Sequence, residues 1–457
     1  MYDVLVIGAG LSGLQAALTA QQAGLSVVVV EARDRVGGKT WSVPLASGRG
    51  CVELGAAWTN DTNQRRIWAY VQKFGLKMFQ QPIGGDCVMY ENSTTKHKFP
   101  FGTTPKFSTE ETKDLERLRD AIAAKTLTAS GDPEDDKITL EEFGKKLGAT
   151  QKTLDMINLW ARVMLGVEHS ELSAEYFFDY CRRGGGFYQM RSDAKDGAQY
   201  LRFQDGSQSV SKGIASLIGH ANIQLSTPVA SVEDRGSYVI TTSTDGKRFR
   251  SKKVVLSVPS TLYKDITFSP ALPGPKRRVT DTTILGDYSK TIVCYDRPWW
   301  RDLGFNGMCL SYEGPIIVGR DTSVDDKGQY SFTFFCNGGP SREWTKLPPH
   351  ERRAKVLQHL AAMFDNHPEV YKPIEVFEQE WQKEQYSKGA VCPVTEVGLL
   401  SELNAEYRAP AGNLHFVGTE YAAEWKGYME GAVCSGEDGG KEVVEALRAD
   451  KKLQARL

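Results

Sequence analysis

The chain has 457 residues and a formal net charge of −1, with 56 Lys and Arg against 57 Asp and Glu. This length exceeds a single core and predicts two or three domains, and the balanced charge gives no reason to expect nucleic acid or an anionic membrane as a partner. Eight cysteines occur without a CxxC pair or a Cys/His cluster. This argues against a metal site and a disulfide framework, and favours an intracellular protein that binds a small molecule.

A dinucleotide-binding pattern opens the chain. Residues 4–7 are a short apolar run typical of a buried parallel strand, Gly8, Gly10 and Gly13 follow directly, and residues 11–22 are predicted to form a helix. Three glycines in such a turn allow a tight bend, close backbone approach to a diphosphate, and close packing of the helix on the strand. A diphosphate is therefore expected at the positive end of this helix.

A second strand, residues 26–30, ends at Glu31, where the same pattern places an acid for a ribose hydroxyl. The run that begins there, E-A-R-D-R-V-G-G-K-T, resembles the flavin amine oxidase family, whose members carry E-A-R-x-R-x-G-G-[RK]-[ST] at this point. The resemblance implies FAD as the cofactor. The N-terminal residues that we expect to bind it are Gly8, Gly10, Leu11, Ser12, Gly13, Glu31, Ala32, Arg33, Gly38, Lys39 and Thr40.

Residues 51–58, C-V-E-L-G-A-A-W, resemble the family's D/E-L-G-G-x-[WY] segment beside the flavin, with an alanine in place of the second glycine. Further along, a valine stands where the family places one whose backbone contacts the adenine end. The resemblance thus adds Gly55, Ala56, Ala57, Trp58 and Val229 to the expected cofactor-binding residues.

From about residue 80 the composition turns polar and irregular, and amphipathic helical runs follow, which predicts an inserted domain. Dense aromatic residues at 176–180 and 187–188 fit core packing and an apolar amine site equally well. From this region, Tyr188 and Gln199 are candidate substrate-binding residues.

Residues 284–300 resemble the family's G-x-x-x-K strand, with Gly286 and Lys290 in register. In the family this lysine holds a water against flavin N5, which implies a catalytic role for Lys290. From the residues alone, a solvent-exposed lysine on an edge strand would be the default interpretation.

Whether the flavin is covalently attached depends on residues 381–394. Trp381 opens this segment and is an expected cofactor contact, and Ala390 stands where some family members attach FAD through a cysteine. Val391 replaces one tyrosine of the family's aromatic sandwich, which predicts a wider amine site. We expect noncovalent FAD, although Cys392 would lie on the same strand face as Ala390 and leaves covalent attachment open.

Residues 414–443 resemble the family's closing motif, F-x-G-[TE]-x-T…W-x-G-[YF]-x-x-G-A. The resemblance implies that Gly418, Thr419 and Glu420 contact the diphosphate and ribityl chain. It also implies that Met429 approaches the flavin O2 end, and that Tyr428 forms the remaining sandwich wall and guides the amine, which makes it the second catalytic candidate.

The predicted fold is α/β, with a discontinuous Rossmann-like FAD-binding domain and an inserted mixed α+β substrate-binding domain. The FAD-binding domain is expected to take residues 1–79, 202–275 and 388–450, the substrate-binding domain residues 80–201 and 276–387, and a C-terminal tail residues 451–457.

No apolar run approaches the roughly 20 residues of a spanning helix, so we expect a soluble chain without a membrane anchor. The last residues, Ala455-Arg456-Leu457, resemble a variant peroxisomal address, an interpretation that we weigh evenly against a helical tail without function. The expected location is the peroxisome or the cytoplasm. An import receptor and a homo-oligomer stay open as partners.

Together the motifs predict FAD-dependent oxidative deamination of primary amines, long-chain or bulky aliphatic ones, with O2 as the second substrate and aldehyde, ammonia and peroxide as products. An L-amino acid oxidase would need an arginine for the carboxylate, and Arg182, Arg183 and Arg191 could serve, although surface arginines are the simpler interpretation. A polyamine oxidase would need a carboxylate-lined tunnel, which the sequence does not locate. A flavin-dependent C–C desaturase and a non-enzymatic flavoprotein are further alternatives.

Overall fold

The N-terminal strand, glycine turn and helix form the centre of a large sheet. In the computed structural model, which describes residues 1–403 and 407–454, β1 (Tyr2–Ile7) is followed by α1 (Leu11–Gln22) and β2 (Val27–Val30). All four valines of β2 are buried, and β1 pairs in parallel with β2 and with β13 (Arg248–Leu256). These segments are continuous apolar runs because parallel strands are covered on both faces.

The first sheet has eight strands in the order β10-β2-β1-β13-β12-β11-β14, with β22 beside β13. Its other strands are β10 (Ile223–Gln224), β11 (Val229–Asp234), β12 (Val239–Ser243), β14 (Thr267–Ser269) and β22 (Leu414–Phe416). Helices α1, α9 (Gln208–Ile218) and α15 (Met429–Gln454) share one apolar core with β1 and β2. A mixed sheet covered by helices confirms the predicted α/β class.

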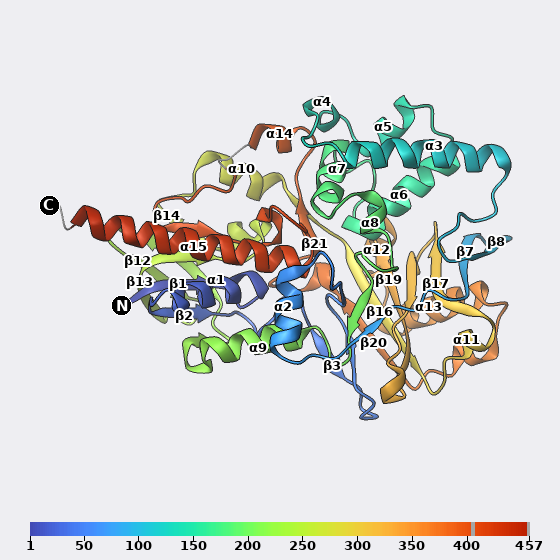
Figure 1. Cartoon of the computed structure of the whole chain (residues 1–457), viewed down its shortest axis with the longest axis horizontal. Helices are drawn as coiled ribbons and strands as arrows, with labels where there is room; N and C mark the ends of the chain where they lie inside the picture. The colour runs from blue at the N-terminus through green and yellow to red at the C-terminus, as the bar shows by residue number, and fades with distance from the viewer. Residues whose placement is uncertain (404–406, 455–457) are drawn as a thin grey trace.

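Helices α1 and α15 run side by side, as Figure 1 shows, and they meet through glycines. A Cβ added to Gly436 would lie 2.3 Å from the carbonyl oxygen of Ser12, and one added to Gly440 would lie 2.7 Å from Thr19 Cβ. No larger residue fits at either position without a shift of one helix, because real Cβ atoms do not approach other atoms so closely. The last long helix is therefore packed directly against the first.

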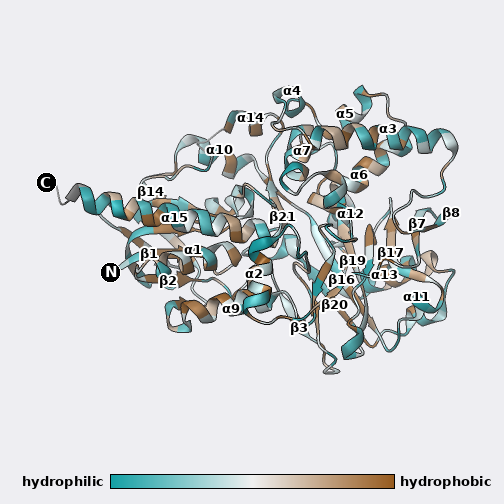
Figure 2. Cartoon of the chain, viewed as in Figure 1, coloured by the Kyte–Doolittle hydropathy of each residue, from teal (hydrophilic) through white to brown (hydrophobic). Residues whose placement is uncertain are grey.

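A second sheet of seven strands has the order β20-β16-β19-β18-β17-β7-β8. Its strands are β7 (Asp86–Asn92), β8 (Thr95–Pro100), β16 (Tyr288–Tyr295), β17 (Phe305–Ser311), β18 (Val318–Asp321), β19 (Tyr330–Asn337) and β20 (Glu375–Glu380). Helix α13 (Pro349–Met363) and the pair Trp299 and Trp300 complete an apolar core with several of these strands. In Figure 2 strands β17 and β19 are largely brown, while many helices alternate between teal and brown, as expected of amphipathic helices that pack on apolar strands.

The segment after residue 80 is more regular than predicted. We expected irregular chain there, but residues 86–100 form the β7–β8 hairpin, with Cys87 and Met89 buried. The expectation was wrong because the sequence of β8, T-K-H-K-F-P, is largely polar and has no pattern typical of a buried strand. This segment becomes a strand because it pairs with β7 at the edge of the sheet.

The helices that follow pack together around a third core. They are α3 (Thr109–Thr126), α5 (Leu140–Lys146), α6 (Gln151–Leu165), α7 (Ala174–Arg183) and α8 (Phe187–Met190), while the short α4 (Pro133–Asp136) lies against α7. The remaining shorter elements are β3 (Ser42–Pro44), β4 (Cys51–Glu53), β5 (Trp58–Thr59), α2 (Arg65–Lys73), β6 (Met78–Gln80), β9 (Leu201–Phe203), α10 (Gly274–Thr282), β15 (Ile284–Gly286), α11 (Trp299–Asp302), α12 (Gly339–Trp344), β21 (Ala390–Val394) and α14 (Leu399–Leu403). The domain boundaries drawn from the sequence stay a prediction.

Among the described residues, the helices include none that is long and apolar enough to cross a membrane. All eight cysteines are free, and all except Cys51 are buried. The terminal tripeptide 455–457 lies outside the described residues, and so the peroxisomal address and the import receptor stay predictions. The homo-oligomer stays a prediction as well.

Candidate active site

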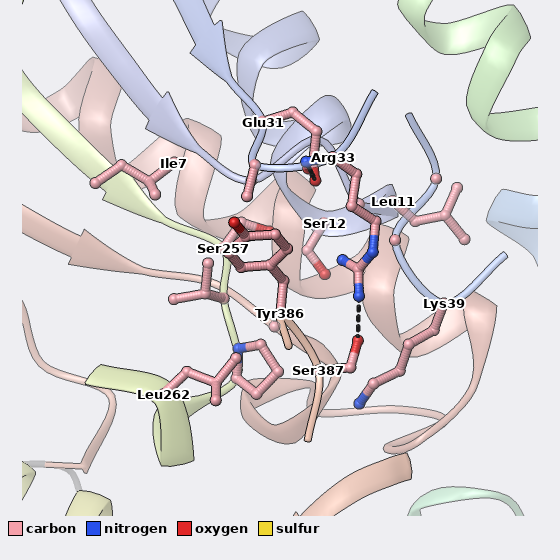
Figure 3. Close-up of a pocket in the computed structure, with 18 of the residues that line it drawn as sticks. Ile7, Leu11, Ser12, Glu31, Arg33, Lys39, Ser257, Leu262, Tyr386 and Ser387 are labelled. Atoms are coloured by element: carbon pink, nitrogen blue, oxygen red, sulfur yellow. Dashed lines mark hydrogen bonds between the residues drawn. The ribbon is translucent and has the colours of Figure 1, made fainter. Parts of the chain in front are cut away.

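A cavity of about 710 Å³ lies where β1, β2 and β13 end and α1 begins. Carboxyl ends of parallel strands and a helix N-terminus meet there, the arrangement in which α/β sheets bind dinucleotides. Figure 3 shows Glu31, Arg33 and Lys39 around this cavity, with Arg33 hydrogen bonded to Ser387 over 2.9 Å. Arg33 also pairs with Glu384 at 3.1 Å, which holds the segment before β21 against the first sheet.

The three glycines of the turn differ in their surroundings. Gly8 has a φ of +101°, a conformation that residues with a Cβ rarely adopt. A Cβ on Gly13 would lie 2.0 Å from the Gly8 carbonyl oxygen and 2.9 Å from Ser257 Cβ, so Gly13 lets α1 pack on the strands and does not itself line the cavity. A Cβ on Gly10 meets nothing within 4 Å, and Gly10 lines the cavity, which leaves a cradle for a closely approaching group.

Glu31 is buried at the end of β2, and its carboxylate accepts hydrogen bonds from the backbone N–H groups of Ala9 (2.6 Å) and Arg33 (2.9 Å). These bonds fix the carboxylate at the cavity wall, where a ribose hydroxyl would reach it. Glu420 is also buried and accepts from the N–H of Ser260 (2.8 Å), and burial raises its pKa.

Most of the residues predicted to bind the cofactor line this cavity: Gly8, Gly10, Leu11, Ser12, Glu31, Ala32, Arg33, Gly38, Lys39, Thr40, Ala56, Val229, Gly418, Thr419, Glu420 and Met429. The sequence reasoning missed several others, among them Ser257, Pro259, Leu262, Tyr386 and Ser387. The missed residues carry no motif, since they reach the cavity only because β13 pairs with β1 and the segment before β21 is bound to Arg33.

A second cavity, of about 770 Å³, adjoins the first. Its lining includes the remaining predicted cofactor residues, Gly55, Ala57, Trp58, Trp381 and Ala390, and all five predicted catalytic and substrate residues, Tyr188, Gln199, Lys290, Val391 and Tyr428. Six residues line both cavities and mark their junction: Lys39, Ala56, Val391, Gly427, Tyr428 and Met429. The structure thus brings the two groups of predicted residues together at one place.

Lys290 lies in the interior of the second sheet. Strand β16 is paired on both sides, by β19 and β20, and the lysine is only 4% exposed, so the alternative of an edge-strand lysine in solvent is wrong. Its Nζ donates to the backbone carbonyls of Glu53 (2.8 Å) and Gly55 (2.6 Å) and lies 4.9 Å from the Phe335 ring centre. Burial lowers the pKa of this ammonium group, and one of its three N–H groups is left for the cavity.

Tyr428 stands at the junction of the cavities. Its hydroxyl accepts a hydrogen bond from Gln199 Nε2 (3.2 Å), and its ring packs at 5.2 Å from Trp425. Burial raises its pKa far above the ordinary value, so it stays a neutral phenol. Thr419 Oγ1 accepts from the Gly427 N–H (2.7 Å) and donates to the Tyr428 carbonyl (3.1 Å), which fixes the turn before α15.

The aromatic residues of 176–188 divide between the two roles considered for them. Phe177 and Phe178 are fully buried in the helical core and line neither cavity, whereas Tyr180 lines the second one. Tyr188 is 52% exposed at the cavity rim and donates to Asp120 (2.5 Å). Each of the two interpretations, core packing and cavity lining, therefore holds for some of these residues.

Comparison with known proteins assigns the family. A family model described as "Flavin containing amine oxidoreductase" matches residues 11–443. The chain belongs to this family. It is 30% identical to "Probable flavin-containing monoamine oxidase A" of Dictyostelium discoideum, over 99% of both chains, and 30% identical to "Amine oxidase [flavin-containing] B" of Sus scrofa, over 97% of this chain and 86% of the relative.

Solved structures of other flavin amine oxidases have the same fold. Putrescine oxidase, wild type bound to putrescine, superposes with a TM-score of 0.89 at 25% identity over 97% of this chain and 99% of the other. Cyclohexylamine oxidase from Brevibacterium oxydans IH-35A superposes with a TM-score of 0.89 at 26% identity over 98% and 99%. The chain is thus a flavin amine oxidase that uses FAD, and the alternative of a non-enzymatic flavoprotein is wrong.

The residues present fit FAD. The open space at Gly10, the fixed carboxylate of Glu31 and the dipole of α1 would hold the ribose and diphosphate. Lys39 lies at the junction and donates to the Val391 carbonyl (3.2 Å), and burial lowers its pKa. Trp381 is held by a hydrogen bond from its Nε1 to the Leu54 carbonyl (2.8 Å), beside the space expected for the flavin ring.

Proposed function

We propose that this flavin amine oxidase oxidatively deaminates primary amines with O2, yielding aldehyde, ammonia and hydrogen peroxide. The observation that supports this most strongly is the junction at which the cofactor cavity opens into a second cavity lined mainly by apolar side chains. When bound, FAD would accept a hydride from the amine carbon while the amine nitrogen loses a proton. Water would hydrolyse the imine to aldehyde and ammonia, and the two electrons and two protons would pass to O2 as hydrogen peroxide. All other tasks fall to the chain itself.

The chain binds the amine in its neutral form and orients it. Residues such as Leu159, Met156 and Phe335 give the second cavity an apolar wall, which disfavours an ammonium ion relative to the free amine. Tyr428 orients the amine from one side, and Lys290 uses its remaining N–H group to hold a water in the second cavity. The roles of both residues come from the family resemblance, and burial and the two carbonyl contacts of Lys290 support them.

Long or bulky aliphatic amines fit this site best. The flavin ring would take only the end of the second cavity near Trp381 and Lys290, which leaves the part toward Tyr188 for the amine, and Val391 leaves open the space that a tyrosine would close. Cys392 lines neither cavity, and burial raises the pKa of its thiol to about 11, so we propose that FAD is held noncovalently. A polyamine would need carboxylates along the cavity, but its described lining includes a single one, the exposed Asp196.

Anaerobic mixing of the purified holoenzyme with benzylamine, alkylamines of increasing length, spermidine and L-amino acids tests this proposal. Bleaching of the flavin absorbance by monoamines, followed by peroxide when air is admitted, is the expected result. Lys290→Met should keep the bound flavin but slow its turnover. A yellow protein that no amine bleaches would refute amine oxidation and favour the C–C desaturase alternative.

A further inference from the structure

Arg191 stands out among the residues that line the second cavity. Its guanidinium carbon lies 4.5 Å from the Trp160 ring centre and 4.8 Å from that of Phe187. Within residues 1–403 and 407–454 its side chain makes no hydrogen bond or ion pair. Arg182 and Arg183 are different: they pair with Glu175 (3.0 Å) and Asp179 (2.9 Å) and line neither cavity.

The neighbours of Arg191 are aromatic rings, which offer no hydrogen-bond acceptor to its N–H groups. The two rings are inclined at 64° to each other, so the guanidinium group can stack on at most one of them. Its N–H groups are therefore available to a ligand in the cavity that it lines. A carboxylate accepts two parallel hydrogen bonds from a guanidinium group.

The charges around the cavity also favour an anionic ligand. Its lining carries six basic side chains, Lys39, Arg119, Arg191, Lys195, Lys290 and Arg320, against one acidic side chain, Asp196. Arg119 pairs with Asp120 and Arg320 with Asp193, both at 3.0 Å, whereas Lys195 has no ion pair among the described residues. Arg191 is itself exposed, and its guanidinium group is protonated at neutral pH.

The unpaired positive charge lies toward the cavity opening. Arg191 follows α8, next to Tyr188, which is half exposed at the rim, and Lys195 is exposed as well. Trp381 and Lys290 are each 4% exposed, so the flavin end is the closed end of the cavity. A substrate with its amino group at the closed end would extend its other end toward Arg191.

We propose that Arg191 binds an anionic group, a carboxylate in the simplest case, at the end of the substrate remote from the amine. This inference rests on the proposed amine oxidation and narrows it to amines that carry a distal negative charge. The same positive charge disfavours diamines, whose second ammonium group would meet it.

The test compares dodecylamine with 12-aminododecanoate, which differ by one carboxylate, and with L-norleucine, whose carboxylate adjoins the amine. In the holoenzyme, Arg191→Met should lower kcat/KM for 12-aminododecanoate relative to dodecylamine by about tenfold, as expected when a charge-assisted hydrogen-bonded pair is lost at a partly solvated site. Arg191→Lys should recover part of this ratio. The matched control Lys195→Met removes another exposed charge from the same cavity, one without flanking aromatic rings, and should change the ratio by about twofold or less.

A second readout does not depend on turnover. Dodecanoate, which has no amine to oxidise, should bind to the wild-type holoenzyme, and calorimetry should show Arg191→Met weakening that binding by a similar factor. Equal losses for both amines in Arg191→Met, with dodecanoate binding unchanged, would show a purely structural role and overturn the proposal. Preferred oxidation of L-norleucine would overturn the distal position. If no amine is oxidised, the proposed function fails, while dodecanoate still tests the anion site.

Discussion

Replacing Gly13 by alanine should destabilise the protein even without cofactor. The added Cβ would lie 2.0 Å from the Gly8 carbonyl oxygen and 2.9 Å from Ser257 Cβ, both in the interior where α1 meets the first sheet. Overpacking of a core usually costs 1–3 kcal/mol, and the near neighbour here is backbone, which cannot rotate away. We therefore expect a loss of about 3 kcal/mol in the unfolding free energy of the apoprotein.

The matched variant Gly10→Ala separates packing from cofactor binding. Its Cβ meets nothing within 4 Å, and Gly10 has a φ of −71°, which alanine adopts without strain. The apoprotein should lose less than about 0.5 kcal/mol, yet its affinity for FAD should fall by more than about tenfold, because the methyl group occupies the space of a diphosphate.

Urea unfolding of both apoproteins and titration with FAD, followed by quenching of flavin fluorescence, measure these two effects. The reasoning is refuted if Gly10→Ala unfolds as easily as Gly13→Ala, or if it binds FAD as tightly as the wild type.

Three further predictions concern pH, the flavin linkage and substrate width. Burial lowers the pKa of His359, whose Nδ1 accepts from the Ile316 N–H (3.2 Å), from 6.5 to about 4. The folded protein therefore resists protonation of His359. The free energy of unfolding should fall as the pH drops below 6.5, by about 2 kcal/mol at pH 5. Urea unfolding between pH 7.5 and 5 should show that the unfolding free energy of His359→Gln depends less steeply on pH than that of the wild type. Parallel pH dependences of the two proteins would contradict this. Acid precipitation should release all FAD into the supernatant, because Cys392 faces neither cavity; flavin that stays in the pellet would show a covalent bond. Val391→Tyr should lower kcat/KM for branched amines more than for linear ones, and an equal effect on both would argue against Val391 as a wall of the amine site.

Sequence reasoning succeeded where one residue type has a physical role that few others can fill. The glycine turn, the acid at Glu31 and the order of the motifs were enough to predict the α/β fold and the family. The interior position of Lys290 was harder, since the strand T-I-V-C-Y that follows it fits an edge as well as a centre; the two partner strands come from residues 330–337 and 375–380.

Other features depend on packing between distant segments and left no trace in the pattern. The hairpin at residues 86–100 was missed because its second strand is polar and its pairing lies at a sheet edge. Arg191 was considered only as one of three arginines, with solvent exposure as the simpler interpretation, and it is exposed in the structure; the pattern did not show that it also lines the second cavity. Its position in the cavity depends on Trp160 in α6 and Phe187 in α8, whose rings lie 4.9 Å apart.

The glycine contact between α1 and α15 bears on the order in which the protein is assembled during synthesis. The helix that would hold the diphosphate emerges from the ribosome first, but its packing partner is made of residues 429–454, and Met429 and Gly418 of the same cavity are also late. The nascent chain thus lacks a complete cofactor site until the residues of α15 have been translated. Flavin loading is therefore expected only after α15 has left the ribosome, and until then the exposed flank of α1 makes the partly folded chain prone to aggregation.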